Sequence, residues 1–183
     1  QPTILIGCSA QHSAFNESIV KSMAKHCARP IIFPLSNPTS KSEATPKDLI
    51  EWTEGRVIVA TGSPFEPVDY QGKIMRISQC NNAFVFPGIG LGLIASQATQ
   101  VSDAMITAAS NALSDTSPIL ANPNDPVLPE ISQAPQISRK IAFAVAMQAI
   151  SEGHASTEYK SNMKQRIDAI YWTPQYYPIE FKE

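Results

Sequence analysis

Side-chain amides are the groups in this chain best suited to hold a small polar ligand. Asn81 and Asn82 stand side by side before an apolar run at residues 83–86, and Asn37 lies in a Ser-Asn-Pro sequence. An amide offers both hydrogen-bond donors and an acceptor. Asparagine is unfavourable in strands and needs partners once buried. A ligand-binding role and a plain turn role both stay open, because Asn-Pro is also a common turn dipeptide.

The usual catalytic side chains are sparse. No histidine stands beside a nucleophile or a carboxylate cluster, so His12, His26 and His154 are expected at the surface. Cys80 has no neighbouring base to activate it, which favours a small buried thiol. Lys41 is expected to be a solvated loop residue.

The acidic residues are also scattered, and we expect the following to be solvated: Glu43, Glu54, Glu66 and Asp69. A divalent cation would need two or three converging carboxylates. The sequence indicates no such set, so we assign neither a metal ligand nor a catalytic residue to this chain.

Three apolar runs, each followed by a polar loop, must position the amides. They lie at residues 3–6, 30–33 and 57–60. Two helical segments separate them, one capped by Asn16 and one by Thr45 with proline at its first position. This β-α-β-α-β order predicts a parallel, doubly wound sheet. Right-handed crossovers would bring all three loops to one edge, where such sheets bind ligands.

The segment 66–78 is predicted to be an excursion, with a small hairpin around Gln71 and Gly72 that returns the chain to that edge. The apolar run 83–86 is interpreted as a strand that ends at a proline. Glycines at positions 88, 90 and 92 then open a helix. They do not form a dinucleotide fingerprint, so ligand contact and close packing both stay open.

The remainder of the chain is predicted to be helical. Helices are expected at 93–98, 102–114, 139–152 and 157–170, with a proline-rich loop at 116–136 and an extended tail at 171–183. The fold class is therefore α/β, a partial Rossmann-like doubly wound parallel sheet with carboxyl-terminal helices. We predict two parts, residues 1–92 and residues 93–183, with the helices and tail packed on the sheet.

Composition excludes several classes of protein. The formal charge of −2 gives no electrostatic reason to bind nucleic acid or an anionic membrane. No apolar run reaches the roughly 20 residues that span a bilayer. The three cysteines form no CxxC pair, which favours a reducing cytoplasm. Because Gln1 and Pro2 lead directly into a strand, we expect the chain to be a piece of a longer one.

Three long segments occur in order along the chain and carry a resemblance. They read LSNPTSKSEAT at 35–45, ATGSPFEPV at 60–68 and QCNNAFVFPGIGLG at 79–92. Together they closely resemble malic enzymes, more specifically the bacterial NAD-linked type. The likeness extends over nearly the whole chain and implies the carboxyl-terminal part of the NAD-binding domain.

The resemblance implies both an activity and a site. Malic enzymes oxidise L-malate with NAD or NADP and decarboxylate the product to pyruvate, using Mg²⁺ or Mn²⁺. By this resemblance Asn37 lies near the nicotinamide ribose and malate, Asn82 contacts malate, and Asn81 lies on the nicotinamide side. Gly7 and Ser9 belong to the turn that passes beside the dinucleotide.

The family's general acid, general base, malate-binding arginine, metal ligands and glycine fingerprint all lie upstream of these segments. We therefore expect this piece to be inactive alone, with its metal bound elsewhere, and the intact protein to be a homodimer or homotetramer. Two alternatives stay open. One is a malolactic enzyme, which makes lactate from malate. The other is a stand-alone nucleotide-binding or small-molecule-binding regulatory module.

Overall fold

The first part of the chain forms a parallel sheet, as the apolar runs predict. The computed structural model describes residues 1–181. The strand order is β1-β2-β3-β6, and all neighbours are parallel. The strands are β1 (Ile4–Gly7), β2 (Ile31–Pro34), β3 (Ile58–Thr61) and β6 (Ser78–Gln79). Because all four strands are parallel, their carboxyl ends and the loops that follow lie along one edge.

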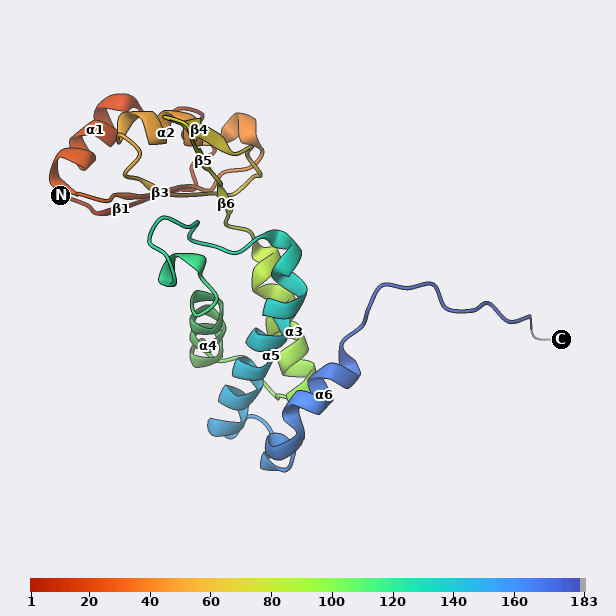
Figure 1. Ribbon diagram of the computed structural model, residues 1–183. Coiled ribbons are helices and arrows are strands. Elements are labelled where there is room, and N and C mark those ends of the chain that lie inside the picture. Colours follow the sequence, from red (N-terminus) through yellow and green to blue (C-terminus); the bar gives the residue numbers. More distant parts are fainter. Residues whose placement is uncertain (182–183) are drawn as a thin grey trace.

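Two helices cover one face of this sheet, α1 (Glu17–His26) and α2 (Pro46–Trp52) (Figure 1). Both predicted caps are confirmed. The side chain of Asn16 accepts from the Ile19 N–H, and that of Thr45 accepts from the Asp48 N–H, both at 3.1 Å. Apolar side chains of the helices and strands pack together beneath them, including Val20, Ile32, Leu49, Ile50 and Val59.

The other face of the sheet is apolar and partly open. Ile4 and Ile6 on β1 are 53% and 58% exposed, and Ile31 and Phe33 on β2 are half-buried. The loop between α4 and α5 passes below this face towards β6, as Figure 1 shows. A parallel sheet with apolar side chains on both faces normally carries cover on both. Within residues 1–181, the outer strand β1 lacks that cover.

The predicted hairpin is confirmed, and one further strand was missed. β4 (Val68–Tyr70) and β5 (Lys73–Met75) pair in antiparallel fashion around Gln71 and Gly72. The chain then adds β6 beside β3, with Ser78 opposite Ala60. β6 has two residues, too few to leave an apolar pattern in the sequence.

The interpretation of residues 83–86 as a strand is wrong. They belong to the 3-10 turn η2 (Asn82–Phe84) and to the start of helix α3 (Phe86–Ser96). Pro87 does not end this segment, because a proline in the first turn of a helix leaves no hydrogen bond unmade.

The second part of the chain is a bundle built on one long helix. α5 (Ala134–Ser151) packs against α3, α4 (Asp103–Ser114) and α6 (Met163–Ile170). α5 begins five residues before the predicted start at 139. Short 3-10 turns complete the chain: η1 (Thr39–Lys41), η3 (Pro118–Leu120), η4 (Ile131–Gln133) and η5 (Thr157–Asn162). Figure 1 shows the bundle below the open face of the sheet.

The glycines of α3 serve helix packing. A Cβ on Gly88 would lie 2.7 Å from Ile141, and one on Gly92 would lie 2.6 Å from the Ala142 carbonyl oxygen. A Cβ on Gly90 would meet nothing within 4 Å. Two of the three glycines therefore let α3 approach α5, which is the packing alternative considered for this segment.

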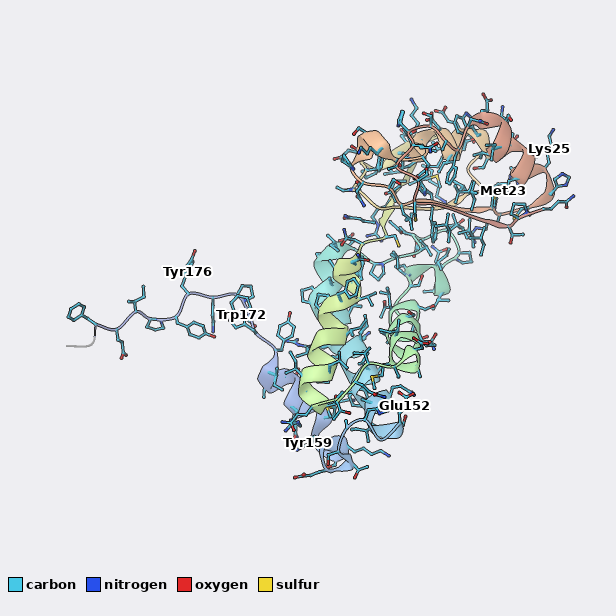
Figure 2. The ribbon with its side chains drawn as sticks, turned by 180° about the vertical axis from the view of Figure 1, so that it is seen from behind. Met23, Lys25, Glu152, Tyr159, Trp172 and Tyr176 are labelled. Atoms are coloured by element: carbon cyan, nitrogen blue, oxygen red, sulfur yellow. The ribbon has the colours of Figure 1, made fainter. Side chains whose placement is uncertain are left out.

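The tail is extended but stands away from the bundle. Figure 2 shows Trp172 and Tyr176 along an arm that leaves the helices. Trp172 is 62% exposed and Tyr176 fully exposed, so the structure does not pack this segment on the sheet; residues 182–183 lie outside the described part. The predicted division at residue 92 stays a prediction, and α3 runs through that position. No helix within residues 1–181 has the length and apolarity needed to cross a membrane.

Candidate functional site

The loops at the carboxyl edge of the sheet continue the strand pairing for a residue or two. The Leu35 N–H donates to the Gly7 carbonyl at 2.8 Å, and the Gly62 N–H donates to the Pro34 carbonyl at 3.2 Å. The Cys80 N–H donates to the Thr61 carbonyl at 2.8 Å. Each loop is therefore held against the next, and the predicted amides start from adjoining positions.

Glu43 ties the first two loops together and is the main surprise of this edge. Its side chain is completely buried, whereas the sequence analysis expected it to be solvated. One carboxylate oxygen accepts from the Ser9 N–H at 2.7 Å, from the Ser9 hydroxyl at 3.0 Å and from the Ser36 hydroxyl at 2.5 Å. The other accepts from the Ser36 N–H at 3.4 Å. That expectation is wrong, because these donors replace water around the charge.

The protonation state of Glu43 follows from those contacts. Burial raises the pKa of this carboxyl group, but hydrogen bonds from Ser36, Ser9 and the backbone outweigh it and lower the pKa to about 2. Donors aimed at a carboxylate favour its charged form. Glu43 therefore carries its negative charge at any physiological pH.

Gly7 and Ser36 make room for this carboxylate. A Cβ on Gly7 would lie 2.7 Å from the Glu43 carboxyl carbon and 2.7 Å from the Phe15 ring. The hydroxyl of Ser36 donates to Glu43 and accepts from the Ala10 N–H at 2.8 Å. The loop after β1 is thus held in place by a residue 34 positions further along the chain.

Asn37 lies at the end of β2 and is oriented by the third loop. Its amide oxygen accepts a hydrogen bond from the Ser63 hydroxyl, and its amide nitrogen donates to the Leu35 carbonyl at 3.3 Å. The Asn37–Pro38 peptide bond is cis. An amide nitrogen carries two N–H groups, so Asn37, which is exposed, keeps one for a ligand.

Asn81 and Asn82 follow β6, the strand that lies beside β3. The amide oxygen of Asn81 accepts from the Ala83 N–H at 2.9 Å and so caps the turn that Asn82 begins. Both side chains are exposed. Cys80 is half-buried; burial, with a smaller effect from Cys8, raises the pKa of its thiol, so it is not an activated nucleophile.

The structure therefore joins the loops of Gly7, Ser9 and Asn37 by direct hydrogen bonds and places Asn81 and Asn82 after β6, which is separated from β2 by β3. Their roles towards a cofactor or substrate stay predictions. Sequence reasoning missed Glu43, Ser36 and Ser63, which hold these loops. One signal was present: Glu43 stands inside the 35–45 motif that carries the resemblance.

The other candidate catalytic residues behave as expected. His12, His26 and Lys41 are exposed, as are the acids Glu54, Glu66 and Asp69. His154 is half-buried, and its backbone carbonyl accepts from the Thr99 N–H at 2.9 Å. Across residues 1–181, no three histidine, cysteine, aspartate or glutamate side chains lie close enough together to hold a metal ion.

A groove of about 780 Å³ lies at the opposite, amino-terminal end of the strands. Three arginines line it, and each has its own protein partner. Arg29 donates to the Pro123 carbonyl, Arg56 donates to three carbonyls at the end of α1, and Arg76 pairs with Glu130 at 2.8 Å. These contacts explain the arginines as structural, so the polar carboxyl edge remains the candidate site.

A parallel sheet with helices on one face and small polar loops gathered at its carboxyl edge defines a Rossmann-like nucleotide-binding domain. Comparison with known families agrees with this class. Residues 1–150 match the family model described as malic enzyme, NAD binding domain. The chain belongs to that family.

Curated relatives and solved structures show the same likeness. The chain is 52% identical over 176 residues to an NAD-dependent malic enzyme of Acinetobacter baylyi and 54% identical to one of Aeromonas hydrophila. Each alignment covers 96% of this chain and 31% of the relative, so the chain spans about a third of their length. The crystal structure of Entamoeba histolytica malic enzyme matches with a TM-score of 0.68 and 28% identity, over 91% of this chain and 33% of that one.

Proposed function

We propose that this chain is the carboxyl-terminal part of an NAD-dependent malic enzyme. The intact protein would oxidise L-malate and decarboxylate it to pyruvate and CO₂ while NAD is reduced. Relatives that are about half identical over almost the whole chain carry that name. The observation that carries the proposal is the joining of the motif loops, by Glu43 and by the Asn37–Ser63 pair, at the edge where such sheets bind dinucleotides.

The residues of this edge fit part of a dinucleotide. Ser9 is exposed and has a small side chain, so a ligand can approach the loop closely at that residue, whereas Gly7 is buried against Glu43. Asn37 and Asn81 offer uncharged donors and acceptors for a ribose or a carboxamide. NAD, when bound, accepts a hydride from C2 of malate. An uncharged amide can hold a ligand beside that step without adding a charge that opposes it.

Malate binding is assigned to Asn37 and Asn82. The Ser63 hydroxyl fixes the orientation of the Asn37 amide, which leaves an N–H free for a carboxylate or hydroxyl oxygen of malate. Asn82 is exposed directly after the turn that Asn81 caps. The two amides would hold the substrate from the ends of β2 and β6, on either side of β3, and orient its C2 towards the cofactor.

The remaining machinery belongs to the preceding polypeptide in this proposal. The acidic residues of the described chain do not converge, so the Mg²⁺ or Mn²⁺ ligands, the general acid and the general base are assigned upstream. The open face beside β1 would be covered by that same polypeptide. The isolated piece would be inactive. We place the intact enzyme in the cytoplasm, in line with three free cysteines in residues 1–181. We also propose that it is a homodimer or homotetramer.

The test is a product assay on the intact protein. With L-malate, NAD and Mn²⁺ we expect NADH and pyruvate in equal amounts. Lactate without net NADH would instead identify a malolactic enzyme. Absence of any malate-dependent product would contradict the proposed function. The 183-residue chain assayed alone should show no turnover and no tight NAD binding, and micromolar binding by calorimetry would overturn that part.

A further inference from the structure

One side chain makes most of the hydrogen bonds that link the loops after β1 and β2, beside the Leu35–Gly7 backbone bond and the Ala10–Ser36 bond. Glu43 follows the short turn η1, and its carboxylate reaches back under both loops to Ser9 and Ser36. The Phe15 N–H also donates to the Glu43 backbone carbonyl at 3.0 Å, which holds the residue at this position. Five donors from the two loops therefore meet at this one residue.

Neutral hydrogen-bond donors stabilise the negative charge of Glu43. Within residues 1–181, its carboxylate makes no ion pair, and its contacts are serine hydroxyls and backbone N–H groups. A buried charge without a counter-ion stays ionised only while such donors point at it. Any shift of either loop would remove donors from the carboxylate. Such a shift would therefore cost free energy, because the buried charge would lose hydrogen bonds.

We propose that Glu43 is a positioning residue of the NAD site, which holds the Gly7–Ser9 loop and the Ser36–Asn37 loop at one fixed separation. The inference rests on the proposed function. Glu43 is completely buried, so it does not touch the ligand and acts through the loops. Small displacements of groups that bind a cofactor weaken binding strongly. A buried carboxylate that fixes the positions of these groups therefore affects the kinetics of the enzyme.

The test uses Glu43→Gln in the intact enzyme. The amide has nearly the same shape but no charge, and its NH₂ group would face the Ser36 N–H, a second donor. We expect the KM for NAD to rise about tenfold or more with little change in kcat, because cofactor binding is lost without a change in the chemical step. A role in folding alone would lower the active fraction, and hence the apparent kcat, and leave KM unchanged.

Thr53→Val is the matched control. The Thr53 side chain is also completely buried, between α2 and β3. Its hydroxyl donates to the Leu49 carbonyl at 2.6 Å and accepts from the Val57 N–H at 3.2 Å. It lies before β3, away from the carboxyl edge. This variant should lose thermal stability and keep the wild-type KM for NAD.

Ser36→Ala provides a second variant if Glu43→Gln fails to fold. It removes the shortest contact to the carboxylate and should raise the KM for NAD in the same direction, by a smaller factor. A wild-type KM in the folded Glu43 or Ser36 variant, or an equal rise in Thr53→Val, would overturn the inference. Failure of the proposed function shows separately, as a wild-type enzyme without malate-dependent reduction of NAD.

Discussion

Gly62 lies so close to Leu35 that a Cβ at position 62 would be 2.1 Å from the Leu35 carbonyl oxygen and 2.9 Å from the Asn37 amide nitrogen. The loops after β2 and β3 can touch only because residue 62 has no side chain. This contact sets the position of Asn37 together with its hydrogen bond from Ser63.

Gly62→Ala should therefore displace the Asn37 loop. The added methyl group cannot fit without a backbone shift, and we expect a loss of at least about 1–3 kcal/mol in the free energy of unfolding. The KM values for malate and NAD should rise as well. Urea unfolding and steady-state kinetics of the intact enzyme would measure both effects. Wild-type values for both would mean that the two loops are not packed as the structure shows.

Gly92→Ala should loosen the packing of α3 on α5. Its methyl group would lie 2.6 Å from the Ala142 carbonyl oxygen, so we expect destabilisation by about 1–3 kcal/mol. Gly90→Ala is the matched control, two residues along the same helix with open space around it. It should stabilise the helix by about 0.5–1 kcal/mol, because alanine loses less backbone entropy. Equal thermal shifts in both variants would contradict this account of the glycines.

Asn82→Ala should mainly impair the use of malate. Loss of the amide leaves polar groups of the bound substrate unpaired, at a cost of about 1–3 kcal/mol, which is about a 5- to 150-fold fall in kcat/KM for malate. Asn111→Ala, an exposed asparagine on α4, serves as the control and should behave as wild type. Unchanged malate kinetics in the Asn82 variant would remove this residue from the substrate site.

Glu43 should make the stability of the protein depend on pH in the acid range. Its folded pKa of about 2 lies below the ordinary value of 4.5, so its contribution is fully present above about pH 4.5 and is lost as the pH falls towards 2. Neighbouring serines and backbone groups do not titrate there. The free energy of unfolding should fall less steeply on acidification in Glu43→Gln than in wild type. Asn111→Ala, which removes no titrating group, should keep the wild-type slope, and identical slopes in all three proteins would contradict the shift.

The open face beside β1 should be covered in the intact protein. Ile6 is 58% exposed in this chain, although it stands in a row of apolar side chains on the sheet. Ile6→Asp should lower the free energy of unfolding of the intact enzyme by at least about 2 kcal/mol, because it would place a charge in an apolar contact. Ile74→Asp, at a site on the hairpin that is 66% exposed, should cost less than about 1 kcal/mol. Similar costs at both sites would show that β1 is an exposed edge.

Much of the fold followed from local patterns in the sequence. The apolar runs predicted β1, β2 and β3, and residues with strong positional preferences identified the starts of α1 and α2 at Asn16 and Thr45. Gln71 and Gly72 marked the hairpin. The three motifs carried the family resemblance. These features depend on residues a few positions apart, so they can be predicted without knowing which distant segments they contact.

Other features were decided by contacts between distant segments. Two-residue β6 exists because β3 offers it a pairing edge, and residues 83–86 became turn and helix, which packs Phe84 and Val85 in a cluster with α5 and leaves Phe86 exposed. The glycines of α3 acquired their role from Ile141 and Ala142 on another helix.

The sequence by itself determined the class of domain, the parallel strands β1, β2 and β3, and the segments that reach its carboxyl edge. Only the tertiary structure decided that Glu43 is buried and that it joins two of those segments. Whether a carboxylate is solvated or buried depends on where its donors lie in space, and here one donor comes from 34 residues earlier in the chain. Helix caps and strand patterns act within one or two turns, so they carry no trace of such a contact.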